Sequence, residues 1–167
     1  MLPWIIGGLL MFVVLCIMFG AIPLANWYKR REARQALILF RIRREMLEAR
    51  FFDLARVQGK PRDLRWVECD WQDEVTFARD RETGLLTAFV AVNIRFEAVE
   101  GGDMEDVAAV GTVRDAAAIF HYRDGHWGTG GRALFNMNPA DALRSFAQQY
   151  APLADILNAK AQASTVQ

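Results

Sequence analysis

Residues 120–127 read Phe-His-Tyr-Arg-Asp-Gly-His-Trp, and this stretch decides the fold. Asp124-Gly125 between two apolar segments is a favoured two-residue hairpin turn, because both central residues of that turn need a positive φ. In this register Arg123 faces His126, Tyr122 faces Trp127, and side chains alternate between the two faces of the strands. The stretch therefore predicts an antiparallel hairpin with an apolar face of Phe120, Tyr122 and Trp127 and a polar face of His121, Arg123 and His126.

Upstream of the hairpin, alternating segments predict further strands. Residues 65–71 would form one strand, with Val67, Cys69 and Trp71 on a common face, and residues 74–78 a second, short one. The polar residues 79–84 end in glycine and predict a turn.

A longer strand is predicted over residues 85–99, followed by an acidic loop at 100–106 and a further strand over 107–122. After the turn, Gly128-Thr129-Gly130-Gly131-Arg132 predicts a bulged or twisted strand end. Consecutive strands joined by short turns indicate an antiparallel meander of four to six strands. In the long strand, one face would carry Leu86, Val90, Val92, Ile94 and Phe96, and the other Thr87, Asn93, Arg95 and Glu97.

Residues 29–58 predict a basic amphipathic helix that ends near Gly59 and Pro61. Its apolar stripe packs either on the following sheet or on a second copy in a parallel coil. We favour the sheet, because the stripe is broader than a coiled-coil seam and Arg44 interrupts it. The stripe comprises Ala33, Leu37, Phe40, Leu47, Phe51 and Leu54, widened by Ile38, Leu39, Ile42 and Met46.

A last helix is expected to begin at Asn138-Pro139, since Asn caps helices and Pro suits the first helical position. Pro152 would bend or divide it, and residues 161–167 would be a flexible tail. The predicted class is thus α+β, with residues 64–160 as a soluble domain. Its shape resembles cystatin-like and NTF2-like rolls, although no motif identifies a family. The expected stripe of the last helix is Leu143, Phe146, Tyr150, Leu153 and Leu157.

An apolar run at the N-terminus predicts a membrane anchor over residues 1–28. Leu2 to Ala25 suffices to span ~30 Å of hydrocarbon as a helix. It lacks the basic start and the cleavage context of a signal peptide. Aromatic and basic residues suit the headgroup zones at its two ends. These membrane-interface residues are Trp4, Trp27, Tyr28, Lys29, Arg30, Arg31 and Arg34.

The basic residues that follow the run predict its orientation, because basic loops remain in the cytoplasm. We expect a single-pass protein of the inner (cytoplasmic) membrane, with its N-terminus outside and residues 29–167 in the cytoplasm. Residues 1–65 carry 12 Lys and Arg against 5 Asp and Glu, whereas residues 66–167 carry 8 against 15. The basic stretch lies beside the membrane, where anionic lipid accounts for it, so nucleic-acid binding is not expected.

Candidate chemical groups are few. His121, Arg123 and His126, with Asp115 further along the strand, form a polar set, but a metal site would need another ligand. Cys69 is expected to face inward as a small hydrophobe, and Cys16 lies in the apolar run, so no disulfide is expected. The glycine-rich stretch lacks the ending of a phosphate-binding loop, and we expect no cofactor. Two acidic clusters match no calcium loop: Glu68, Asp70, Asp73 and Glu74, and Glu100, Asp103, Glu105 and Asp106.

Two functions fit these patterns. The favoured one is a membrane-tethered, non-enzymatic module that binds a protein partner or self-associates through residues 33–54. The alternative is a small-ligand or enzymatic pocket inside the roll, with His121, Arg123 or Asp115 as polar groups. A filled core with an exposed apolar stripe on residues 33–54 would favour the first, and a deep pocket with convergent polar groups the second.

Overall fold

The structure is a computed structural model that describes the backbone of residues 2–58 and 63–154, and their side chains except at 2–23, 25, 26, 108 and 109. The contacts divide the chain into two units, Met1–Gln35 and Ala36–Gln167. The first helix, α1 (Leu2–Val57), runs through both units, and all strands belong to the second.

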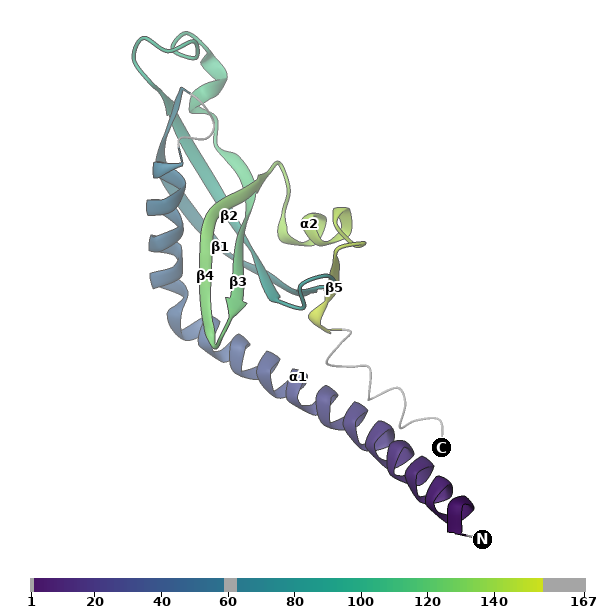
Figure 1. The fold of residues 1–167 in the computed structure, drawn as a ribbon. Coiled ribbons are helices and arrows are strands. Elements are labelled where there is room, and N and C mark those ends of the chain that lie inside the picture. The colour runs from purple at the N-terminus through teal and green to yellow at the C-terminus, as the bar shows by residue number, and fades with distance from the viewer. Residues whose placement is uncertain (1, 59–62, 155–167) are drawn as a thin grey trace. The chain divides into compact units, whose positions relative to one another are not determined.

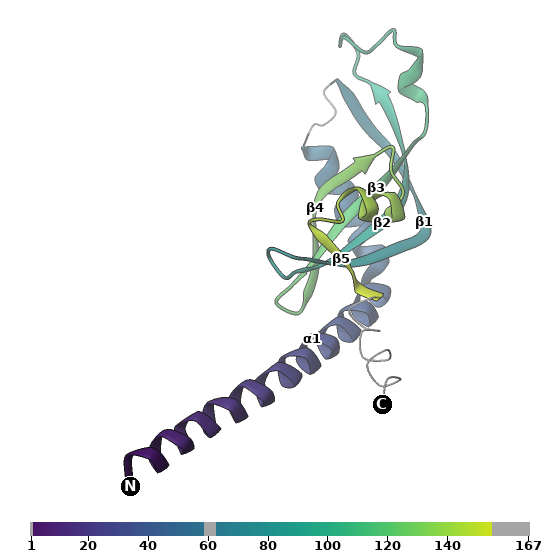
Figure 2. The same ribbon diagram turned by 90° about the vertical axis from the view of Figure 1, so that its right-hand side faces the viewer.

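Five antiparallel strands form one curled sheet, a half-barrel, in the order β4-β3-β2-β1-β5 (Figures 1 and 2). From Ala36 onward α1 packs on one face of the sheet, as predicted, and the short helix α2 (Pro139–Ser145) covers part of the other face. The α+β class is therefore confirmed. The strands are β1 (Leu64–Asp80), β2 (Leu86–Ala98), β3 (Arg114–Arg123), β4 (His126–Phe135) and β5 (Tyr150–Pro152).

The β3–β4 hairpin has the register predicted from its sequence. Asp124 and Gly125 have φ values of 52° and 81°, as this turn type requires. Tyr122 pairs with Trp127 and Arg123 with His126. The predicted apolar face, including Phe120, is buried, and the predicted polar face is exposed.

The core between α1 and the sheet is built from aromatic rings. Phe40 stands edge-on to Phe77, Phe120 and Trp127, with ring centroids 4.9–5.7 Å apart. Further along α1, Phe51 contacts the rings of Trp66, Trp71 and Phe120, with centroids 5.3–6.1 Å apart. Such pairs add roughly 0.5–1.5 kcal/mol each beyond the area they bury. The space between helix and sheet is thus filled by side chains.

The prediction that Val67 shares a face with Cys69 and Trp71 is wrong, because β1 contains a bulge at Val67. Trp66 pairs with Phe96 and Glu68 with Arg95, so Val67 is an extra residue and points outward. Trp66 is buried in its place. An extra residue reverses the alternation, which is why a regular period of two fails here. Cys69 and Trp71, after the bulge, pair with buried Ile94 and Val92.

The two strands predicted over 65–71 and 74–78 are in fact one strand. A second bulge between Trp71 and Val75 carries the polar residues that looked like a break, and pairing with β2 continues beyond it. Residues 107–113 are not strand either, since they contain the 3-10 helix η1 (Ala108–Gly111) and β3 starts only at Arg114. Ala and Val are compatible with both conformations, so this composition alone could not decide.

A third bulge lies in β4, within the glycine-rich stretch where it was predicted. Thr129 pairs with Phe120 and Ala133 with Ala118, and the Thr129 hydroxyl donates to the Ile119 carbonyl at 2.9 Å. Gly131 has a φ of 68°, and a Cβ there would lie only 2.7 Å from the Ala55 backbone nitrogen. Glycine therefore allows the sheet to touch the helix backbone directly.

The predicted last helix is shorter than expected. Asn138 caps α2, and its side chain accepts a hydrogen bond from Asp141 N–H at 2.7 Å, but the helix ends at Ser145. Tyr150 and Pro152 belong instead to β5, which pairs with Ala78–Asp80 at the end of β1. Leu157 and the predicted tail lie outside the described residues.

The β5 strand and α2 create a second, smaller core on the face of the sheet away from α1. Phe89 of β2 stands edge-on to Tyr150, with ring centroids 5.2 Å apart. The second core explains why Thr87 and Phe89 are buried although they lie on the face predicted to be polar. The cluster is formed by Ala78, Phe89, Ala117, Ile119, Ala142 and Tyr150.

Trp127→Ala is expected to lower the free energy of unfolding by roughly 3–5 kcal/mol, because a buried ring is lost from the aromatic core. Trp127→Phe keeps most of that packing but removes the hydrogen bond from indole Nε1 to the Ala36 carbonyl, 2.7 Å long, and should cost about 1 kcal/mol more than its lost volume. Guanidinium unfolding of the full chain in detergent measures both. An unchanged midpoint for the alanine variant would contradict this core.

Candidate interaction surface

The outer side of α1 carries large apolar side chains that no other described part of the chain covers. Ile38, Ile42 and Met46 are 58%, 73% and 58% exposed. Their four-residue spacing places them in one row along the helix, and Ala49 extends the row. We call these four residues the α1 ridge. They lie opposite the buried row of Phe40, Leu47 and Phe51, so this helix is apolar on two faces.

Two open grooves border the ridge. The groove toward β4 has a volume of about 510 Å³, and the groove toward β1 about 290 Å³. Ala49 lines both. The first is lined by Met46, Leu47, Ala49, Arg50, Asp53, Trp127, Gly128 and Thr129, and the second by Glu48, Ala49, Phe52, Val67, Glu68, Cys69 and Trp71.

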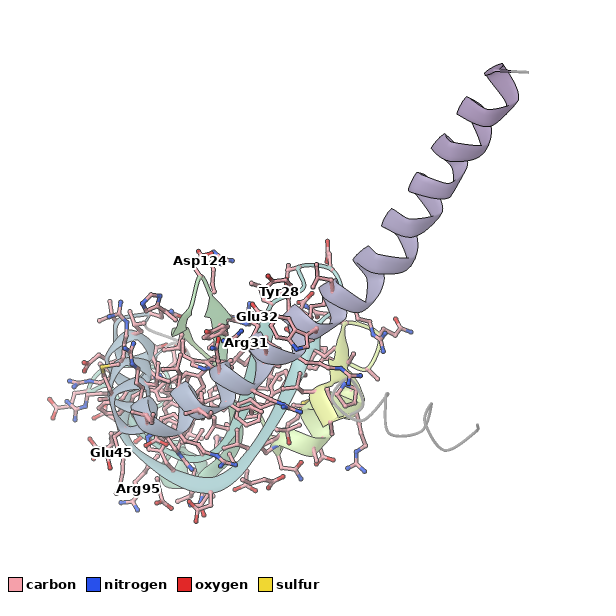
Figure 3. All side chains as sticks on the ribbon, turned by 90° about the horizontal axis from the view of Figure 1, so that it is seen from below. Tyr28, Arg31, Glu32, Glu45, Arg95 and Asp124 are labelled. Atoms are coloured by element: carbon pink, nitrogen blue, oxygen red, sulfur yellow. The ribbon has the colours of Figure 1, made fainter. Side chains whose placement is uncertain are left out.

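Arginines flank the ridge. Each residue turns the helix by ~100°, which places Arg41 on one side of the ridge and Arg43 and Arg50 on the other. All three are exposed and have no ion pair within the described part of the chain. The exposed carboxylates nearest to the ridge on α1 are Glu45 (Figure 3) and Asp53.

Arg44, which interrupts the predicted stripe, has a structural role. Its guanidinium pairs with Glu48 at 2.6 Å and with Asp73 at 3.6 Å, and it donates to the Gln72 carbonyl. Gln72 and Asp73 lie in the second bulge of β1. Arg44 therefore ties α1 to the bulge.

The predicted polar set on the hairpin is only partly assembled. His121, Arg123 and His126 line one open depression of about 360 Å³ with Trp127, Gly128 and Thr129. Asp115 lies six residues from His121 on the same strand, roughly 20 Å away, in a separate depression. His126 Nδ1 is 2.8 Å from the Asp124 carbonyl at the hairpin tip (Figure 3). In the described residues, no three His, Cys, Asp or Glu side chains are placed to hold a metal.

Sequence reasoning missed a polar cluster at the end of β1. Buried Asp80 accepts hydrogen bonds from the Glu82 and Thr83 N–H groups, both 2.9 Å, and from Gln149 Nε2 at 3.1 Å. These bonds, the one from Thr83 first, hold the pKa of Asp80 below its usual range despite its burial. Asp80 thereby joins the turn after β1 to the segment before β5. The polar residues 79–84, which end in glycine, predicted the turn. The contact with the segment before β5 joins residues far apart in the sequence, so no local pattern predicted it.

His121 adjoins this cluster. Its Nδ1 lies 3.2 Å from the hydroxyl of Thr87, which is fully buried. Partial burial lowers the pKa of His121, and Asp80 opposes that effect while Arg123 and Arg132 add to it. The Thr87 hydroxyl is therefore shielded from solvent and links β2 to β3 through His121.

An acidic depression of about 620 Å³ lies on the sheet face that α2 partly covers. It gathers part of one predicted acidic cluster, Asp73 and Glu74, together with Asp115 and Asp141. Glu68 and Asp70 of the same cluster do not line it, and the loop at 100–106 is also separate. In that loop, Glu105 accepts a hydrogen bond from Gly101 N–H at 2.8 Å.

Cys69, predicted to face inward, is only partly buried beside Trp71 and lines the groove toward β1. Burial first, and the charge of Glu68 second, raise the pKa of its thiol to about 12. The thiolate is the reactive form, so the thiol is inert near neutral pH.

Of the predicted membrane-interface residues, Trp4 lies outside the described side chains. Trp27 and Tyr28 are exposed and stack edge-on at 5.1 Å, and the Arg31 guanidinium lies 5.4 Å from the Trp27 ring centroid. Among the residues whose side chains the structure describes, no helix is long and apolar enough to cross a membrane. The span predicted over Leu2–Ala25 falls almost wholly outside them and stays a prediction.

Comparison of the chain with protein-family models, with curated proteins and with solved structures found no match.

Ile42→Gln is expected to change the free energy of unfolding by less than ~0.5 kcal/mol, because its side chain is exposed on the ridge. Leu47→Ala, on the buried face of the same helix, should lower it by roughly 2–5 kcal/mol. Unfolding of both variants, followed by tryptophan fluorescence, makes the comparison. Equal losses would show that the ridge is part of the core.

Alkylation of Cys69 by a maleimide is expected to be slow at pH 8 and to accelerate as the pH rises toward the pKa of about 12. Unfolding should bring the rate to that of a free thiol, with a pKa of ~8.5. Mass spectrometry of the peptide that contains Cys69 distinguishes it from Cys16. Fast labelling of the folded protein at pH 8 would contradict the raised pKa of the Cys69 thiol.

Proposed function

We propose that this protein is a membrane-tethered α+β module that binds a protein partner or self-associates at the cytoplasmic side of the inner membrane. The observation that carries the proposal is the α1 ridge. The helix uses one apolar face for its own sheet and leaves a second one bare, between two grooves. Contiguous exposed apolar surface with a polar border is typical of interaction sites.

The filled core supports this function over a ligand pocket inside the roll. The helix lies across a curled antiparallel sheet, in keeping with a cystatin-like or NTF2-like roll. A ligand would then lie between helix and sheet, where Phe40 and Phe51 contact the sheet aromatics directly. The polar residues proposed for such a pocket, His121, Arg123 and Asp115, lie outside this space.

The proposed tether is the apolar run Leu2–Ala25, with Trp27 and Tyr28 in the headgroup zone and Lys29, Arg30, Arg31 and Arg34 against anionic lipid. The basic flank supports an N-terminus outside the cell and a cytoplasmic domain. A tether concentrates the ridge near the bilayer, where a partner in the same membrane meets it more often.

Deletion of residues 1–28 is expected to move the protein from washed membranes to the soluble fraction, because the apolar run supplies the attachment. Centrifugation and immunoblotting measure the distribution, with the full chain as reference. If the shortened protein stays in the membranes after a high-salt wash, a single anchor is the wrong explanation.

The same full chain tests orientation. Protease added to spheroplasts should leave the domain intact and digest it only after lysis. Digestion before lysis would place the domain outside and exclude a cytoplasmic partner.

A further inference from the structure

Resting on the proposed function, we infer that the α1 ridge docks an amphipathic helix of a different protein, whose apolar row is bordered by Asp and Glu. From Ile38 to Ala49 the ridge is roughly 16 Å long at ~1.5 Å per residue. Three turns of a partner helix match that length. Side chains in a straight row fit between the rows of a second helix, and the groove beside Met46 receives the partner's flank.

The excess of arginine over carboxylate among the exposed residues around the ridge favours an acidic partner, whose own carboxylates must lie away from Glu45 and Asp53. Arg41 on one side and Arg43 and Arg50 on the other are exposed and make no ion pair with the described residues. Carboxylates on both flanks of a docked helix would meet these guanidinium groups. Arginine suits such contacts, because its planar fork binds carboxylates with two hydrogen bonds.

A second copy of the chain fits the ridge less well. Exposed positions on α1 beyond Ala36 include Arg41, Arg43, Arg50 and Arg56 against only Glu45 and Asp53. A parallel copy in register would bring these positive faces together, and like charges across an interface are unfavourable.

A lipid surface also fits less well. Glu45 lies beside the ridge, and Glu48, Asp53 and Glu68 line its grooves. An anionic bilayer would repel these carboxylates. A partner helix can carry its acidic side chains opposite the arginines and neutral side chains opposite these carboxylates.

Photocrosslinking of the full chain in its native membrane tests the inference. A benzophenone-bearing residue replaces Ile38, Ile42 or Met46, one at a time, and the same residue at Val113, an exposed apolar side chain just before β3, serves as control. The expected adduct at position 42 is a foreign protein whose crosslinked peptide forms an amphipathic helix flanked by acidic residues. The control position should not give this adduct.

Charge reversal supplies the second readout. Arg43→Glu with Arg50→Glu should reduce the adduct roughly tenfold, because attraction becomes repulsion. Arg81→Glu, an exposed arginine in the turn after β1, is the matched control and should leave the yield unchanged. Thermal unfolding confirms that both variants fold. If the double charge reversal leaves the adduct yield unchanged, the inference is overturned.

The failures of the two proposals differ. An adduct between two copies of this chain overturns the acidic helix and leaves self-association in place. Adducts with lipid alone at positions 38, 42 and 46 overturn both the docked helix and the protein-binding function, and so does the absence of any adduct at all three positions.

Discussion

The packing of Phe40 and Phe51 into the curled sheet is the contact on which the rest of this structure depends. Each ring touches aromatic side chains from more than one strand, so one helix face holds β1, β3 and β4 together. Burial of large rings is the strongest stabilising contribution available to a domain of this size. It also fixes the rotation of α1 about its own axis, because turning the helix would pull both rings out. The outward direction of the ridge is a consequence of that constraint.

The sheet reaches this contact through its irregularities. Extra residues at Val67 and between Trp71 and Val75 bend β1, and a further bulge next to Gly131 bends β4. At Gly131 the sheet meets the helix backbone so closely that a Cβ would not fit. A flat sheet of the same strands would leave a gap beside α1. In the curled sheet, direct contact between α1 and the sheet aromatics takes the place of such a gap.

Local chemistry made part of this fold predictable. The Asp124-Gly125 turn requires positive φ at both residues, and that requirement alone sets the hairpin register and buries Trp127. Val67 was assigned to the wrong face because a bulge reverses alternation without altering composition. Tyr150 was assigned to a helix because β5 exists only through pairing with the distant end of β1. The α1 stripe that contains Phe40 was predicted, but Ile38, Ile42 and Met46 were wrongly added to it, because they lie on the opposite, exposed side of the helix.

The two apolar faces of α1 imply different energetics. Full burial of one large aliphatic side chain contributes roughly 1.5–3 kcal/mol. The three large residues of the ridge thus provide an amount comparable to the ~4–15 kcal/mol that association costs in lost freedom of motion. Such a ridge alone supports only weak binding. The inner face packs on the sheet of the same chain, so its contacts carry no cost of association. Confinement of both partners to one bilayer reduces the cost of association without any new contact. Under the proposed function the anchor and the exposed ridge depend on each other: the arginines around the ridge would supply selectivity, and the anchor would supply the local concentration at which so small a surface is occupied.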